Sequence, residues 1–556
     1  MIEVLSPESH RLLTMPLYIL FPVLVVISVG VYFLSSRLRH GHQRISKLPL
    51  PPGPPQLPVV GNLFNSPFYL RWLDHHKWNY VYGPISHYKV FGHSTIVLTS
   101  LEAAHELLNK RASNYSDRNL SYMVGELVSK GYNILFRQYD SGTRFQQRLH
   151  TNGLSPRAAV RYRPIQELES LQLLGDMLEQ IKATPGESTR EKQPNGLVPL
   201  NPHCDFQRAP ASALHMIVWG YRLQKGKANY QEQMDFFNKC WTIKFLSGSP
   251  PLIDIFPWLQ HIPYYINPWK LAAETYHESD GLHHMENYRN ALRKPGFNMS
   301  KQMNITVDRL KSSTSDTELA WIAGTLTLAN AETTVAILSW LVVAMITYPV
   351  YMHKVQAMLD EVVGNERMPV YADKAQLPYI DAMMEEVMRW RPILPAGMDH
   401  TAREEDEYMG FRIPKGATIV YSSWVIARDK NVFGPDADEF RPERWLEQED
   451  LPRFAFGFGR RVCPGKNVGR EGLWILFARL LWAFDMEAPS DPVTKKKKLI
   501  DPMAMPSFGA TICPNPFEAV FKPRGKWVEH LVSTGLKDAE SHVERLMADP
   551  DLLQGL

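Results

Sequence analysis

The pattern of hydrophobic and polar positions predicts helices through the middle of the chain. Over 168–181, apolar side chains recur at a spacing of about three to four, which is typical of a helix with one buried face. The stretch 317–349 is apolar on nearly all sides, so we expect a helix buried in the core. Thr317 or Asp316 is the expected cap at its start, and Pro349 is expected to end it.

Two other stretches alternate between apolar and polar positions and predict short strands. Residues 82–100 alternate with a turn at Gly92, and residues 408–426 alternate with a turn at Pro414–Gly416. Long helical stretches beside a few short strands indicate a mainly α fold with small β-sheets, an α+β arrangement.

The N-terminal region has the pattern of a membrane anchor. Residues 17–34 are uncharged and apolar, and a run of this length can just span a bilayer. The short segment 1–16 comes before it, and 35–55 is a basic tether that ends in a stiff, proline-rich hinge. The basic residues that follow the run are Arg37, Arg39, Arg44 and Lys47. Their excess on this side places the remainder of the chain in the cytosol.

The apolar stretch 317–349 is also long enough to cross a membrane. Asn330 and Glu332 lie at its centre, and a carboxylate in lipid is costly. A buried core helix is therefore the better interpretation.

Charge and cysteine content exclude several classes of protein. There are 61 basic and 58 acidic side chains, a net charge of 61 − 58 = +3, which gives no indication of a nucleic-acid-binding protein. The four cysteines are too few for a disulfide framework in so long a chain, and none forms a CxxC pair. They are Cys204, Cys240, Cys463 and Cys513.

Cys463 lies in an unusual loop, "FAFGFGRRVCPGKNVG" at 454–469. The thiol could act as a nucleophile, pair with another thiol or bind a metal. Flanking glycines let the backbone approach closely, and Pro464 begins a helix whose dipole stabilises a thiolate. A single thiolate in such a loop suits an axial haem ligand.

Two separate segments supply charges that could support this loop. Glu386 and Arg389 are three positions apart, so they lie on one helical face. Arg444, in "EFRPERW", could complete a Glu–Arg–Arg cluster. If buried, the cluster would hold the cysteine loop rigid.

These features together resemble the cytochrome P450 family. Its haem loop reads Phe-x-x-Gly-x-Arg-x-Cys-x-Gly, its helical pair Glu-x-x-Arg, and a third element Pro-Glu-Arg. The matching residues are Phe456, Gly459, Arg461, Cys463 and Gly465, then Glu386 and Arg389, then Pro442, Glu443 and Arg444. The likeness implies a cytochrome P450 fold with an N-terminal transmembrane helix, a haem-binding monooxygenase domain over 56–523 and an extension over 524–556. The anchor and hinge are similar to those of the microsomal class. The sequences of several segments, 115–118, 154–166 and 410–420, are similar to those of fungal enzymes of secondary metabolism.

The resemblance implies a haem-thiolate enzyme that carries haem b. Cys463 would be the axial ligand of the iron, and Phe456 would pack beside the ring. Arg461, His400 and Arg148 would contact the haem propionates, although Arg144 is an alternative to Arg148.

In the family's oxygen groove, "ANAETT" at 329–334 supplies the acid Glu332 and the alcohol Thr333. Two departures from the family pattern stand out. Asn330 replaces the usual glycine of the groove, where it could narrow the pocket or contact substrate. Thr143 stands at the apparent position of the family's propionate-binding tryptophan.

The same resemblance implies the partners and the reaction. It implies a single-pass protein of the endoplasmic reticulum membrane with a cytosolic catalytic domain. NADPH would supply electrons through a separate reductase, which a basic face around the cysteine loop would attract. The family positions for substrate contact are apolar, and they lie at Met123–Phe136, 245–258, Leu326–Ala331, 393–397 and 506–510. We expect oxidation, most simply hydroxylation, of a small hydrophobic metabolite with O2. A haem-thiolate isomerase or dehydratase that does not use O2 is the alternative, and a non-catalytic haem-binding scaffold is a third reading.

Overall fold

The computed structural model describes residues 48–65, 70–118, 121–182, 196–240, 251–491, 493–506 and 510–548. The chain divides into two compact units, of which the larger is Pro51–Asp406 with Ile413–Leu556. The smaller is Met1–Leu50 with Glu407–Arg412. The predicted segment 1–16, the anchor 17–34 and the basic part of the tether lie outside the described residues. Apart from residues 48–50 and 407–412, the described residues all belong to the larger unit.

Helices make up most of the larger unit, as the periodicity predicted. The longer ones are α2 Arg71–Tyr82, α4 Ser141–Gly153, α6 Arg163–Lys182, α7 His203–Trp219, α8 Ala228–Lys239, α11 Pro268–Arg293, α12 Met299–Leu310, α13 Asp316–Thr347, α14 Pro349–Val362, α15 Pro378–Trp390, α19 Lys466–Ala483 and α20 Lys526–Ala548. The shorter ones are α3 Leu101–Ala104, η2 His105–Lys110, η3 Tyr122–Val128, α5 Pro156–Arg161, α10 Leu252–Ile255, η4 Pro257–His261, η5 Tyr264–Ile266, η6 Tyr371–Gln376, α16 Ser423–Ile426, α17 Lys430–Phe433, α18 Arg444–Glu447 and η7 Gly459–Arg461.

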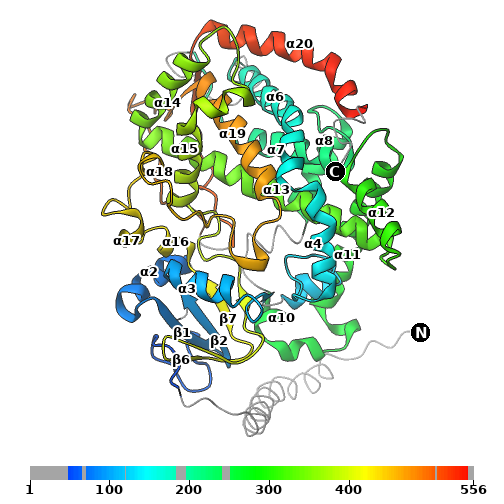
Figure 1. Cartoon of the computed structure of the whole chain (residues 1–556), viewed down its shortest axis with the longest axis vertical. Helices are drawn as coiled ribbons and strands as arrows, with labels where there is room; N and C mark the ends of the chain where they lie inside the picture. Colours follow the sequence, from blue (N-terminus) through cyan, green and yellow to red (C-terminus); the bar gives the residue numbers. More distant parts are fainter. Residues whose placement is uncertain are drawn as a thin grey trace, which may run out of the picture. The chain divides into compact units, whose positions relative to one another are not determined.

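Helix α13 runs through the interior, packed against α7, α11, α15 and α19 (Figure 1). Its end before Pro349 was predicted correctly, but the expected caps Thr317 and Asp316 were wrong. The side chain of Ser315 accepts the hydrogen bond from the backbone N–H of Glu318. Among the described residues, α13 is the one helix long and apolar enough to cross a membrane, and most of its apolar stretch is buried inside the protein.

The strands form three small sheets, which confirms the mixed prediction. The largest has the order β1-β2-β7-β4-β3, with β2 and β7 parallel and the other pairs antiparallel. The strands are β1 Ile85–Val90, β2 His93–Leu98, β3 Asp117–Arg118, β4 His400–Thr401, β5 Asp406–Tyr408, β6 Phe411–Ile413, β7 Thr418–Tyr421, β8 Phe484–Glu487 and β9 Val520–Pro523. The sheet lies beside α2 and α3, and the two short pairs are β5–β6 and β8–β9 (Figure 1).

The C-terminal extension contains α20, which packs along α6 (Figure 1). Glycines let the two helices approach closely. A Cβ atom on Gly175 of α6 would lie 2.6 Å from a methyl carbon of Leu536. On α20, a Cβ atom on Gly535 would lie 3.3 Å from Leu171. Val532 is buried in the contact, so this segment belongs to the core of the larger unit.

Candidate functional site

A cavity of about 350 Å³ lies between α13 and the loop of Cys463. One wall is the middle of α13, and the opposite wall is the cysteine loop with the start of α19. Most of the lining is apolar, and the polar side chains in it are few. The residues that line the cavity include Arg118, His150, Leu326, Ala329, Asn330, Glu332, Thr333, Thr334, Ile393, Leu394, Phe456, Arg461 and Cys463.

The backbone of the loop sets the position of Cys463. Gly459 has a φ of +56°, and a Cβ atom there would lie 2.0 Å from the carbonyl oxygen of Leu108, so glycine is required. The backbone N–H of Cys463 donates to the carbonyl of Phe456 at 2.9 Å. This bond folds the loop back on itself and turns the thiol toward the cavity.

The surroundings of the sulfur favour a bound thiolate. Burial raises the pKa of the Cys463 thiol, while backbone N–H groups of Gly465 and Lys466 donate toward the sulfur and act in the opposite direction. Helix α19 begins at Lys466, so its N-terminal dipole also lies at this sulfur. A metal cation in the cavity would add the positive charge that deprotonates a coordinating thiol.

The predicted Glu–Arg–Arg residues lie together and are buried. Arg389 donates two hydrogen bonds to Glu386, at 2.8 and 2.7 Å, and Arg444 donates one at 3.2 Å. The indole N–H of Trp445 and the backbone N–H of Arg441 also donate to this carboxylate. The remaining guanidinium N–H groups bond backbone carbonyls of the segment 427–439. The cluster therefore fastens helix α15 to the segment that leads to the cysteine loop.

Two arginines, Arg118 and Arg461, line one edge of the cavity, and His400 lies next to Arg118. Arg118 and His400 are directly paired across β3 and β4. His400 must donate through Nδ1, because its partner at 2.6 Å is the carbonyl oxygen of Tyr115. Burial and the neighbouring Arg118 hold the pKa of His400 well below its usual value, so its imidazole is neutral.

Arg118 and Arg461 have no ion pair among the described residues. Arg118 donates to the carbonyls of Met398 and Asp399, and its Nε has no partner. Arg461 donates to the carbonyls of Ser116, Ile134 and Arg137. Burial, together with Arg118, lowers the pKa of Arg461 to about 9. Two guanidinium groups that form no ion pair and lie at the edge of a cavity make a strong site for an anion.

The α13 wall supplies a carboxyl group and a hydroxyl group. Burial raises the pKa of Glu332 to about 7, and among the described residues its carboxylate accepts a hydrogen bond from Gln207 Nε2, at 3.4 Å. The hydroxyl of Thr333 donates to the carbonyl of Ala329 at 2.9 Å. A carboxyl with a pKa near neutrality can give up and regain a proton.

Comparison with known proteins identifies this arrangement. The model of the cytochrome P450 family matches residues 51–513. The chain belongs to the cytochrome P450 family. Similar proteins include the cytochrome P450 monooxygenase aneD of Aspergillus aculeatus, which is 34% identical over 95% of this chain and 97% of its own length. Cytochrome P450 monooxygenase 58 of Postia placenta is 34% identical over 84% of this chain and 87% of its own. The cytochrome P450 monooxygenase peniB of Penicillium patulum is 34% identical over 86% of this chain and 85% of its own length.

The cavity residues of this cytochrome P450 fit a haem. A haem carries two propionates, and Arg118 and Arg461, one buried and one half-buried, line the cavity and form no ion pair among the described residues. Arg118 is the residue that sequence reasoning missed. It lies in "YSDR", but a strand of two residues gives no periodicity to show which side chain faces inward.

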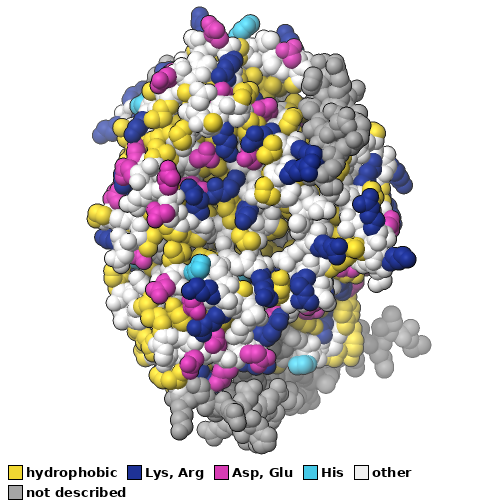
Figure 2. Space-filling view, in the orientation of Figure 1, with side chains coloured by type: hydrophobic (Ala, Val, Ile, Leu, Met, Phe, Trp, Pro, Cys, Tyr) yellow, Lys and Arg dark blue, Asp and Glu magenta, His cyan; other side chains and the backbone are white. Residues whose placement is uncertain are grey.

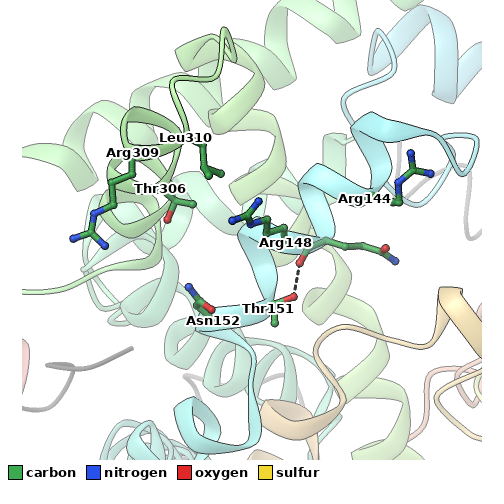
Figure 3. A pocket seen from close by; sticks show the side chains of 8 residues that line it. Arg144, Arg148, Thr151, Asn152, Thr306, Arg309 and Leu310 are labelled. Carbon is green, nitrogen blue, oxygen red and sulfur yellow. Dashed lines mark hydrogen bonds between the residues drawn. The ribbon is translucent and has the colours of Figure 1, made fainter.

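The structure does not bring the predicted Arg148 to this cavity. It lies on the exposed side of α4, where it lines a separate surface pocket with Arg144 and with Arg309 of α12. Figure 3 shows Arg148 extending from α4 toward Thr306 and Leu310 of α12. The inner side of α4 carries the buried His150 instead.

Proposed function

We propose that this cytochrome P450 is a haem-thiolate monooxygenase that hydroxylates a small hydrophobic metabolite, in the manner of fungal secondary metabolism. The observation that carries the proposal is the position of Cys463. Its thiol faces, across one cavity, a buried carboxyl and a hydroxyl on α13. The two guanidinium groups at the edge of the cavity support it.

The haem, when bound, supplies the activation of O2 for insertion of one oxygen atom into a substrate. Cys463 would ligate the iron, with Phe456 packed beside the ring. Arg118 and Arg461 would bind the propionates, and the free Nε2 of His400 lies in the same cluster. Glu332 would pass protons into the cavity, and Thr333 would orient them with its hydroxyl once it releases the carbonyl of Ala329.

The lining supports a hydrophobic substrate. Leu326, Ile393 and Leu394 line the cavity at three of the positions that the resemblance assigned to substrate contact. Residues 245–250 and 507–509, parts of two further such segments, lie outside the described residues.

Electron supply is proposed to come from NADPH through a separate reductase. Arg453 and Arg470 near the cysteine loop pair with Glu385. Arg460 and Lys466 are exposed and have no ion pair among the described residues. Figure 2 shows Lys and Arg side chains across the middle of the face where α4, α6 and α12 lie. An acidic partner is favoured by such a surface.

Location in the endoplasmic reticulum membrane is also proposed. The proposal rests on the apolar run 17–34, and the segment from α10 to η5, residues 252–266, supports it. Apolar and aromatic side chains are exposed there, namely Leu252, Trp258, Tyr265 and Ile266. Aromatic residues are enriched at membrane interfaces.

A carbon monoxide difference spectrum tests the haem-thiolate assignment. The reduced protein with carbon monoxide should show the red-shifted Soret band of thiolate-ligated haem. Reconstitution with NADPH and a reductase should then oxidise substrates only when O2 is present. Equal conversion without O2 would favour the isomerase alternative, and absence of the red-shifted band in haem-loaded protein would refute the assignment.

A further inference from the structure

Asn330 uses both ends of its side-chain amide inside the protein. Its Nδ2 donates to the carbonyl oxygen of Pro210 on α7 at 2.7 Å. Its Oδ1 accepts a hydrogen bond from the hydroxyl of Thr334 at 2.8 Å. Helix α13 is continuous through this turn. The amide therefore bridges two helices and also ties together two successive turns of α13.

The helical geometry shows how this turn is held between α7 and the cavity. Successive residues are about 100° apart around a helix, so Asn330 and Glu332 are about 160° apart by the shorter way, and Thr333 lies between them. All three residues line the cavity. Asn330 and Glu332 also reach α7, through Pro210 and Gln207. The turn is therefore held against α7 on both sides of Thr333.

The two contacts with α7 differ in strength. The Asn330 contact is short, at 2.7 Å, whereas the Glu332 contact is long, at 3.4 Å. The short bond can hold the backbone of the turn while the Glu332 carboxyl remains free to exchange its proton. The Thr333 hydroxyl can likewise release the carbonyl of Ala329 by rotation of its side chain alone, without movement of the helix.

We propose that Asn330 is a positioning residue, which holds the turn with Glu332 and Thr333 at a fixed place against α7. The bridge itself is a property of the fold, and its effect on oxygen chemistry rests on the proposed function. Asn330 acts here through its neighbours, not through substrate. A fixed turn would keep proton delivery directed at the cavity. With a loose turn, O2 would take up two electrons from NADPH and two protons and leave as hydrogen peroxide, without oxidation of substrate.

Three variants separate the parts of the bridge. N330A removes both hydrogen bonds, while N330D keeps the acceptor for Thr334 and loses the donor to Pro210. T334V removes only the hydroxyl that bonds Asn330. T347V is the matched control, because Thr347 makes a back-bond to Val343 farther along the same helix.

Hydrogen–deuterium exchange of the haem-loaded protein measures the bridge without any turnover. We expect the amides of 329–334 to exchange about 10-fold faster in N330A and N330D, because each lost buried hydrogen bond makes local opening easier. T334V should have a smaller effect, and T347V should leave this turn unchanged. Exchange in N330A equal to that of the wild type would overturn the proposal.

The second measurement is the hydrogen peroxide released per NADPH consumed, with a purified NADPH–cytochrome P450 reductase. We expect N330A and N330D to release several-fold more than T347V. Faster exchange without additional hydrogen peroxide would refute the positioning role. A changed KM with unchanged exchange would also refute it, because that result would indicate that Asn330 contacts the substrate. The carbon monoxide spectrum of each variant distinguishes these outcomes from failure of the haem-thiolate assignment, because that failure would appear in the wild type as well.

Discussion

The charged cluster that supports the Cys463 loop is fixed by many short hydrogen bonds, whereas Glu332 on the α13 wall of the cavity has one long contact among the described residues. Glu386 alone accepts from two arginines, an indole and a backbone N–H. Within the described part of the chain, Glu332 accepts one hydrogen bond, from the amide of Gln207 at 3.4 Å. The first arrangement holds a ligand at a constant position, and the second leaves a carboxyl able to change its protonation state.

The difference follows from the number of partners available to each buried carboxylate. A carboxylate that accepts from several donors, two of them cationic, has the cost of its burial offset by those bonds. A carboxylate with one weak donor is destabilised by burial, and its pKa rises, as that of Glu332 does. Glu386 is not among the residues that line the cavity, whereas Glu332 is. The following substitutions test the two regions separately.

The largest effect is expected for C463A. Alanine cannot ligate iron, so the thiolate Soret band and all NADPH-dependent oxidation should be lost. C204A is the control, since Cys204 is exposed and distant from the loop in sequence. The carbon monoxide difference spectrum measures both variants. A thiolate band in C463A would show that another residue holds the iron.

The next effect is expected for E386Q. This change leaves Arg389 buried without its counter-charge, while Arg444 keeps its pair with Asp436, and breaking such a buried pair costs about 3–5 kcal/mol. We expect a lower urea midpoint and a lower haem content after purification. E447Q removes a half-exposed partner of Arg441 and should cost at most about 1 kcal/mol. Similar midpoints for the two variants would contradict the bracing role of Glu386.

The sequence predicted the Cys463 wall better than the α13 wall, for physical reasons. The loop of Cys463 and the pair Glu386–Arg389 are local patterns, in which the neighbours along the chain also determine the conformation. Arg118 was missed because its inward orientation depends on pairing with His400, far along the chain. The partner of Asn330 is likewise a carbonyl on another helix, which no periodicity in α13 reveals.

Local signals also failed where several residues could serve equally well. Ser315, Asp316 and Thr317 are all good N-cap residues, and the sequence alone did not distinguish them. The C-terminal extension had no assigned role, because helix α20 is explained only by its close packing on α6.

E332Q should lower NADPH-dependent product formation by about 100-fold, because the amide cannot donate a carboxyl proton. In the wild type the carboxyl is protonated below pH about 7, so proton donation should fall as the pH rises through 7. E332Q should lose this pH dependence. D316N, on the exposed start of the same helix, is the control. A wild-type pH profile in E332Q would show that another group delivers the proton.

The raised pKa of Glu332 also affects stability. In the unfolded chain the carboxyl ionises near its ordinary value of 4.5, but in the folded protein it ionises only near 7. The folded state therefore binds the proton more tightly. The contribution of Glu332 to stability should decrease as the pH rises from about 4.5 to about 7 and stay constant above that. The melting temperature of the wild type relative to E332Q should fall over the same range.

The smallest effect is expected from R118L, which tests where the propionates bind. Loss of one charge-assisted hydrogen bond of about 1.5–3 kcal/mol should speed haem release by roughly 10- to 100-fold. Transfer of haem to apomyoglobin measures this rate. R148L is the matched control, because Arg148 lies in the surface pocket and should not affect haem release.

The pair of variants distinguishes two ways of holding a haem. If R118L releases haem faster and R148L does not, the charge that balances a propionate comes from the sheet that carries His400. If the order is reversed, α4 must move toward the cavity when haem binds, since Arg148 is exposed and lines the surface pocket with residues of α12. The residual Arg461 explains why R118L should weaken haem binding without abolishing it. The double variant R118L/R461L removes both unpaired cations, and should then release haem faster than either single change.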